Sequence, residues 1–148
     1  MDTLEIILRL AAAALAGAAL GLNRDLRGKP TGVRTLGLVG VGSAAAVLSV
    51  AHFGGDAVSR VIQGIVTGIG FLGAGVIVRN NVGKEVHGLT TAACVWLTAC
   101  AGAACGTGRW PVVLPTMGIV LVILIFGGPF ERWVRRHWPE SDDGSTPG

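Results

Sequence analysis

Five long stretches without charged side chains constrain this sequence more than any other feature. They cover roughly residues 6–22, 36–53, 61–78, 89–105 and 111–126, and apart from Arg9 none contains Lys, Arg, Asp or Glu. A helix needs about 17 to 25 residues to cross a bilayer core, and each stretch is near the lower end of that range. Only 14% of the chain is charged, against about 25% in soluble domains. The sequence therefore predicts an all-α membrane protein, a bundle of about five transmembrane helices.

The basic residues predict the topology of this bundle. Nine of them follow the first, third and fifth stretches, whereas Arg60, Arg109 and Arg9 lie on the other side. The positive-inside rule then places the C-terminus in the cytoplasm and the N-terminus outside a bacterial inner membrane. The leader at residues 1–5 is acidic, so the first stretch is expected to be a permanent span and not a cleaved signal.

Two regions follow from this patterning. Residues 1–136 are expected to form the five-span transmembrane domain. Residues 137–148 are expected to form a short polar, disordered cytoplasmic tail, because PESDDGSTPG offers almost no apolar surface to bury.

The third stretch contains GIVTGIGFLGAG, in which three glycines match the G-x-G-x-x-G pattern of a dinucleotide-binding turn. No β-α-β unit surrounds it, so we expect no phosphate site. Glycines in membrane helices allow close packing, and here they fall on two opposite faces, which predicts a helix in the middle of the bundle. A broken helix that exposes its backbone to a ligand is the open alternative. The glycines concerned are Gly64, Gly68, Gly70, Gly73 and Gly75.

Further small residues recur one turn apart in the first two stretches. Gly17 and Gly21 form such a row with Ala13, and Gly40 forms another with Ala44. These rows predict glycine-rich close packing between helices.

Uncharged polar residues mark the third and fourth stretches. Gln63 and Thr67 lie one turn apart after Arg60, and a second stripe combines Thr91, Cys94 and Thr98. Such groups usually form hydrogen bonds between helices, but they could also line a small path or ligand pocket between the two spans. Thr90 or Thr91 is also expected to cap the fourth helix.

The first connection, GLNRDLRGKPTGVRT at residues 21–35, is rich in charge and contains a predicted turn at Pro30 and Gly32. It is either a solvated basic loop or a structured site for a lipid or a partner. Its candidate functional residues are Arg24, Asp25, Arg27, Lys29 and Arg34.

A magnesium cage needs several oxygen ligands, usually carboxylates. No acidic residue lies deep in a predicted span, and only Asp25 and Glu85 are weak candidates. Mg²⁺ binding is therefore possible but not supported by interior carboxylates.

Other classes of function lack their usual sequence signals. No nucleophile, base and orienting acid can be grouped, so we expect no enzyme and no cofactor. The pI of about 9.1 reflects bases at helix ends without interleaved aromatics, which favours lipid headgroups over nucleic acid. The spacing of Cys94, Cys100 and Cys105 matches no zinc pattern, so these are expected to be packing residues.

Three motifs in order resemble the MgtC/SapB family of bacterial inner-membrane proteins. They are the GLNRDLRGKPTGVRT connection, RVIQGIVTGIGFLGAGVIV at residues 60–78 and GLTTAACVWLTA at residues 88–99. Asn23 and Asp25 stand where the family pattern often has glutamate. Many members carry a further soluble domain, and here we expect the transmembrane domain alone.

The resemblance implies a role in magnesium homeostasis or stress adaptation, including acid stress and intracellular survival in pathogenic members. For some members it also implies contacts with other membrane proteins, such as the ATP synthase. We therefore expect a non-enzymatic membrane factor that acts through a partner or as a homo-oligomer. The alternative is a small ion transporter or channel, with Mg²⁺ as a candidate ion and its path between spans three and four.

Overall fold

The computed structural model describes residues 1–79 and 88–137, and within them the chain forms helices without strands. Five of these helices are long and apolar enough to cross a membrane, which confirms the predicted fold class. They are α1 (Thr3–Leu26), α2 (Val33–Val50), α3 (Gly55–Arg79), α4 (Leu89–Gly106) and α5 (Trp110–His137), with a 3-10 turn η1 (Ala51–Phe53) after α2. The predicted tail lies outside the described residues, except for His137, which ends α5.

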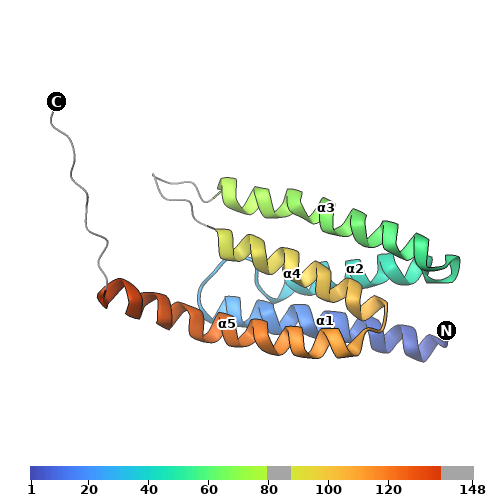
Figure 1. Ribbon diagram of the computed structural model, residues 1–148, viewed down its shortest axis with the longest axis horizontal. Coiled ribbons are helices and arrows are strands. Elements are labelled where there is room, and N and C mark those ends of the chain that lie inside the picture. Colours follow the sequence, from blue (N-terminus) through green and yellow to red (C-terminus); the bar gives the residue numbers. More distant parts are fainter. Residues whose placement is uncertain (80–87, 138–148) are drawn as a thin grey trace.

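Successive helices run in opposite directions. The α1–α2 connection and the C-terminal end of α5 therefore lie at one end of the bundle, and the N-terminus and the α4–α5 turn lie at the other (Figure 1). We call these the loop end and the N-terminal end. This alternation is the one that the basic residues require. Which end faces the cytoplasm stays a prediction.

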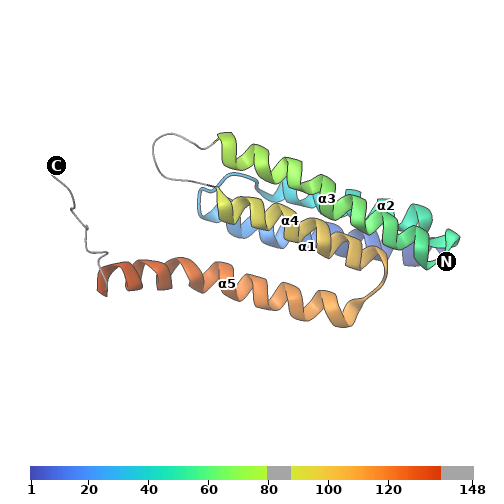
Figure 2. The ribbon, with the colours of Figure 1, turned by 45° about the horizontal axis from the view of Figure 1, so that its top comes forward.

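Helix α4 occupies the centre of the bundle. It contacts each of the other four helices, and more than half of its span is buried, against none of the α3 span. Its residues are mostly Ala, Cys, Thr and Gly, whose small side chains let neighbours approach from several sides. Helices α3 and α5 lie on opposite sides of the α1–α2–α4 core in both views (Figure 1, Figure 2). Within one protomer, the prediction that the third span lies in the middle was therefore wrong.

Glycines set the spacing of the core helices. A Cβ on Gly17 would overlap the backbone carbonyl of Leu36, and one on Gly21 would lie 2.5 Å from the Cα of Val33. On α2, a Cβ on Gly40 would come within 2.6 Å of a backbone oxygen of α1. The expected rows on the first two spans thus pack as predicted. Gly102 of α4, which the sequence reading missed, approaches Gly40 equally closely from the other side.

The glycine-rich helix α3 behaves differently. It is one continuous helix from Gly55 to Arg79, so the alternative of a break is not found. A Cβ on Gly73 would contact Ala92 of α4 at 3.6 Å, an ordinary contact. At the other four predicted packing glycines, Gly64, Gly68, Gly70 and Gly75, a Cβ would meet nothing within 4 Å. The two close-contact faces expected for this helix are therefore not used inside the protomer.

Apolar side chains fill the remaining core in two clusters. One cluster combines Ala13, Ala44, Cys105 and Val113, and the other combines Leu20, Leu36, Cys94 and Val95. All three cysteines are free thiols. The positions of Cys94 and Cys105 in these clusters agree with a packing role.

Candidate functional site

The charged residues of the first connection lie at the loop end, and the first of them belong to a helix and not to a loop. Helix α1 continues to Leu26, four residues beyond the predicted span, so Arg24 and Asp25 belong to its last turn. Arg24 is only 5% exposed. Its position follows from helical spacing, because residues 17, 21 and 24 share one face of α1 and the two glycines on that face are packed against α2. The expectation that Arg24 reaches lipid phosphates was therefore wrong.

Arg24 connects α1 to α4. Its Nη2 donates a hydrogen bond to Oγ1 of Thr91, which is also buried. The N-cap of α4 is Gly88, which makes no side-chain cap, so the prediction that a threonine caps this helix was wrong for Thr91. Nε of Arg24 has no hydrogen-bond partner among the described residues. The guanidinium thus lies near the positive end of the α4 dipole and gives the loop end a fixed buried cation.

Asp25 shapes the turn between α1 and α2. Its Oδ2 accepts a hydrogen bond of 3.0 Å from the backbone N–H of Val33, the first residue of α2. A carboxylate at a helix N-terminus satisfies an otherwise unpaired N–H and complements the helix dipole. A Cβ on Gly32 would collide with this carboxylate, which explains the glycine. Asp25 therefore has a structural task that competes with the metal-ligand role considered for it.

Arg27 fastens α5 to α1. Its Nη2 donates a 2.8 Å hydrogen bond to the carbonyl oxygen of Ile125. That carbonyl is available because Pro129, four residues later in α5, has no N–H to donate to it. A Cβ on Gly128 would lie only 3.1 Å from Nη1 of Arg27, so this glycine leaves room for the guanidinium. The proline, 102 residues after the arginine in the sequence, thus frees the carbonyl that the arginine binds.

The other residues proposed for this end have no such fixed positions. Lys29 and Arg34 are exposed, so they are the candidates for contact with anionic headgroups or a partner. Glu85 lies outside the described residues. Among the described residues no group of His, Cys, Asp and Glu is arranged to hold a metal ion.

The polar path between spans three and four, the alternative interpretation of these residues, is not formed by the described side chains. Gln63 and Thr67 of α3 are exposed. Thr91 turns toward Arg24 instead, and Thr98 is buried, with its hydroxyl donating to the carbonyl of Cys94 in its own helix. Thr98 also lies near Gly40 of α2. Among the described residues, no hydrogen bond thus joins Gln63 or Thr67 to Thr91 or Thr98.

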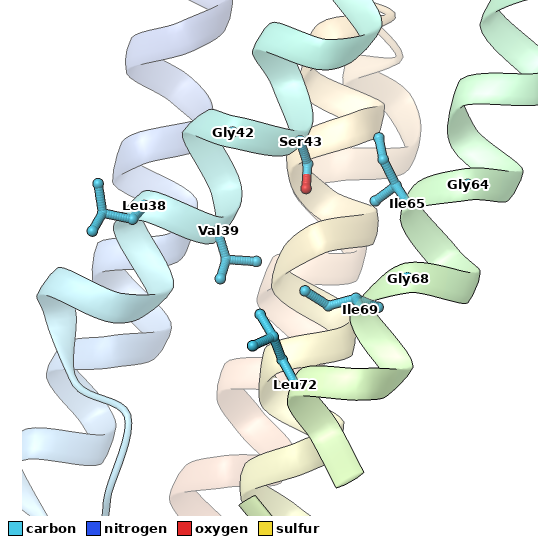
Figure 3. A pocket seen from close by; sticks show the side chains of 9 residues that line it. All are labelled: Leu38, Val39, Gly42, Ser43, Gly64, Ile65, Gly68, Ile69 and Leu72. Carbon is cyan, nitrogen blue, oxygen red and sulfur yellow. The ribbon is translucent and has the colours of Figure 1, made fainter. Parts of the chain in front are cut away.

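An apolar groove of about 320 Å³ runs between α2 and α3. In Figure 3, side chains from both helices border it, and Ser43 points from α2 toward Ile65 of α3. Two of the exposed glycines, Gly64 and Gly68, form part of its α3 wall. A second hollow of about 210 Å³ lies between α3, α4 and the start of α5. Neither lining carries a set of residues for covalent or acid–base chemistry.

The N-terminal end has its own arginine contact, which is partly buried. Arg9 pairs with Glu5 and donates a 2.7 Å hydrogen bond to the carbonyl of Gly106, the last residue of α4. A cation at a helix C-terminus is stabilised by the dipole. Arg9 is therefore held inside the protein, which accounts for the one charge in an otherwise uncharged stretch.

Comparisons with known proteins assign this chain to one family. The family model described as MgtC family matches residues 10–133. Protein SrpB of Synechococcus elongatus is 40% identical over 93% of this chain and 84% of its own length. The Escherichia coli K12 protein named putative magnesium transporter YhiD is 43% identical, and protein MgtC of Salmonella typhimurium is 44% identical. The matches cover 83% and 78% of this chain, but 60% and 49% of those two proteins. No solved structure matches.

Proposed function

Because the chain belongs to the MgtC family, we propose that it serves magnesium homeostasis or stress adaptation as a non-enzymatic factor that acts by association with another membrane protein or with itself. The proposal includes the bacterial inner membrane as its location, with the N-terminus outside and the C-terminus in the cytoplasm. This orientation follows the basic residues at the loop end.

The exposure of α3 carries the association part of the proposal. This helix has the most glycines of the five, each of which lowers helix propensity, and most of them contact nothing in the protomer. In α1, α2 and α4, by contrast, glycines allow the backbones to touch. Glycine in a membrane helix is of most use where another backbone approaches, so a helix from outside the protomer accounts for those of α3.

The contacts of the charges at the loop end point the same way. Arg24, Asp25 and Arg27 are all engaged in contacts within the fold, and among the described residues no hydrogen bond links polar side chains of α3 to those of α4. A path for a cation through one protomer would therefore have few polar groups to replace the water molecules that surround the ion.

A transporter or channel for an ion is the second candidate. It is favoured by the exposed polar residues Gln63 and Thr67, which could line a path formed between copies, and by the similarity to YhiD, which is named a putative magnesium transporter. Flux through purified protein in liposomes separates it from the first proposal.

Growth under limiting magnesium tests the proposed role. A bacterial host that lacks its own copy of this protein should grow poorly in low magnesium and recover with the wild-type chain. The variant Gly70→Leu, on the exposed face of α3, should fail to restore growth at equal membrane abundance. Gly118→Leu, which changes an equally open glycine of α5, is the matched control and should restore it. Equal growth of cells with and without the wild-type chain would contradict the role.

A further inference from the structure

One face of α3 is polar or small from Asp56 to Ala74. It combines Asp56, Arg60, Gln63, Thr67, Gly70 and Ala74, and all six residues are exposed. Their spacing alternates between four and three residues, so at about 100° per residue they fall within about 80° of one another. We call these six residues the α3 stripe. It is distinct from the α2–α3 groove, whose α3 wall is formed by other residues.

The middle of the stripe lies at the depth of the hydrocarbon. Gln63 is eight residues from the start of α3 and sixteen from its end, which at 1.5 Å per residue places it about 12 Å and 24 Å from the two helix ends. Uncharged polar groups facing lipid at this depth have no water to bond with, and such side chains usually face protein. In the protomer, however, nothing covers Gln63, Thr67 or Gly70.

We propose that the α3 stripe is the interface with a second copy of this chain, in which two α3 helices run side by side and parallel. The inference rests on the proposed function, which left the associating partner open, and it identifies that partner as a second copy of the chain.

Parallel pairing follows from the membrane. Two copies inserted in the same orientation are related by a twofold axis along the bilayer normal, so each residue near the axis meets its own counterpart. The six residues recur on average every 3.6 residues, the repeat of a straight α-helix, so they stay on one side of α3 and can face a second α3 along the whole stripe.

The stripe is complementary to itself in this arrangement. The Gln63 amide has both a donor and an acceptor, so two copies can exchange a pair of hydrogen bonds. Thr67 places a hydroxyl one turn further along, and Gly70 allows the closest approach of the two backbones. Near the N-terminal end, Asp56 of one copy lies one turn from Arg60 of the other, so the long arginine side chain can reach diagonally to the opposite charge, and within the protomer these two do not form a salt bridge.

A second copy of the chain fits the α3 stripe better than lipid does. Acyl chains can cover apolar walls such as those between α2 and α3, but they offer nothing to an amide, a hydroxyl or an ion pair. The proposal therefore assigns the polar stripe to protein and leaves the groove to lipid.

Cysteine cross-linking of the full chain in liposomes of phosphatidylethanolamine and phosphatidylglycerol tests the interface. Thr67→Cys and Ala74→Cys should each form disulfide-linked dimers under mild oxidation. Ile119→Cys, an exposed position of α5, is the control and should stay monomeric. The wild-type chain gives the baseline, because its own cysteines all lie in α4.

The outcomes are distinct. Dimers at both stripe positions and none at the control support the interface. Equal cross-linking at all positions, no cross-linking at the stripe, or dimers formed only by Leu72→Cys in the α2–α3 groove would overturn it.

Energy transfer between labelled copies measures the strength of association as the protein is diluted in lipid. Gln63→Leu removes the amide pair and should raise the dissociation constant about threefold to tenfold. Gly70→Leu should raise it more than tenfold because the helices can no longer touch, whereas Gly118→Leu should leave it unchanged. Unchanged association of both stripe variants would overturn the interface.

Failure of the interface and failure of the proposed function give different results. Absence of dimers together with restored growth in low magnesium would remove this interface and leave the function standing. Normal dimers together with no effect of the wild-type chain on growth would remove the function and leave the interface standing.

Discussion

Replacement of Arg27 by methionine should destabilise the bundle only when Pro129 is present. The reason is the carbonyl oxygen of Ile125, which accepts a 2.8 Å hydrogen bond from Nη2 of Arg27 and lacks a helical donor because of the proline. In Pro129→Ala, the new backbone N–H can donate to this oxygen. The guanidinium is then no longer its only donor.

The magnitude follows from the type of bond. Hydrogen bonds to charged groups contribute about 1.5 to 3 kcal/mol, and the exposed position of this one reduces the expected loss on Arg27→Met to about 1 kcal/mol. In the Pro129→Ala background the loss should fall to less than about 0.5 kcal/mol, a coupling of at least about 0.5 kcal/mol, which is within the range for residues that share a partner.

Equilibrium unfolding of the four proteins in mixed micelles with increasing sodium dodecyl sulfate measures this coupling. Arg34→Met provides the control, because that arginine is exposed on α2 and should contribute little. Equal losses on Arg27→Met with and without Pro129 would refute the assignment of the bond to the proline-freed carbonyl.

Three further substitutions test the contacts of the core in the same assay. Thr91→Val should cost about 1.5 to 3 kcal/mol because it removes the one hydrogen-bond partner that a buried guanidinium has among the described residues, whereas Thr90→Val should change little; equal effects would contradict the contact. Gly102→Ala should cost about 1 to 3 kcal/mol through overlap with the α2 backbone, and Gly118→Ala should be neutral or stabilising; a neutral Gly102→Ala would mean that the two helices are further apart. Gly32→Ala should lower stability by about 1 to 2 kcal/mol because its methyl group displaces the carboxylate that bonds the first residue of α2, and an unchanged transition would argue against that bond.

The sequence was sufficient to predict those features of the fold that the bilayer requires, namely the number of long apolar helices and their alternating directions. Five uncharged stretches allow little else, and small residues at Gly17, Gly21 and Gly40 mark faces where backbones meet. The place of the glycine-rich third span could not be predicted in this way. Glycines show that a helix has smooth faces, but not whether a neighbour in the same chain or a second chain lies on them.

The continuity of α3 has a simpler explanation. A broken helix in lipid needs partners for the backbone groups that it frees, and none lie on its exposed faces. Glycine permits a break, but a continuous helix has the lower free energy where no other group can form hydrogen bonds with the freed backbone N–H and C=O groups.

The contacts of the candidate site could be predicted only in part from the sequence. The burial of Arg24 was encoded in its spacing from Gly17 and Gly21, and would have been found by extending the first span through the basic residues. The bond from Arg27 to Ile125 could not have been found, because no local pattern says which carbonyl lies opposite a given arginine. Pro129 did mark a free carbonyl in α5, which is the part of that contact visible in the sequence.

Magnesium flux into liposomes tests the central claim, that the chain acts by association and not by conduction. Purified wild-type protein in vesicles loaded with a magnesium-sensitive dye should give the same entry rate as protein-free vesicles, under conditions in which the protein is dimeric. A protein-dependent flux that Gly70→Leu abolishes and Gly118→Leu preserves would contradict the account and establish a path along α3.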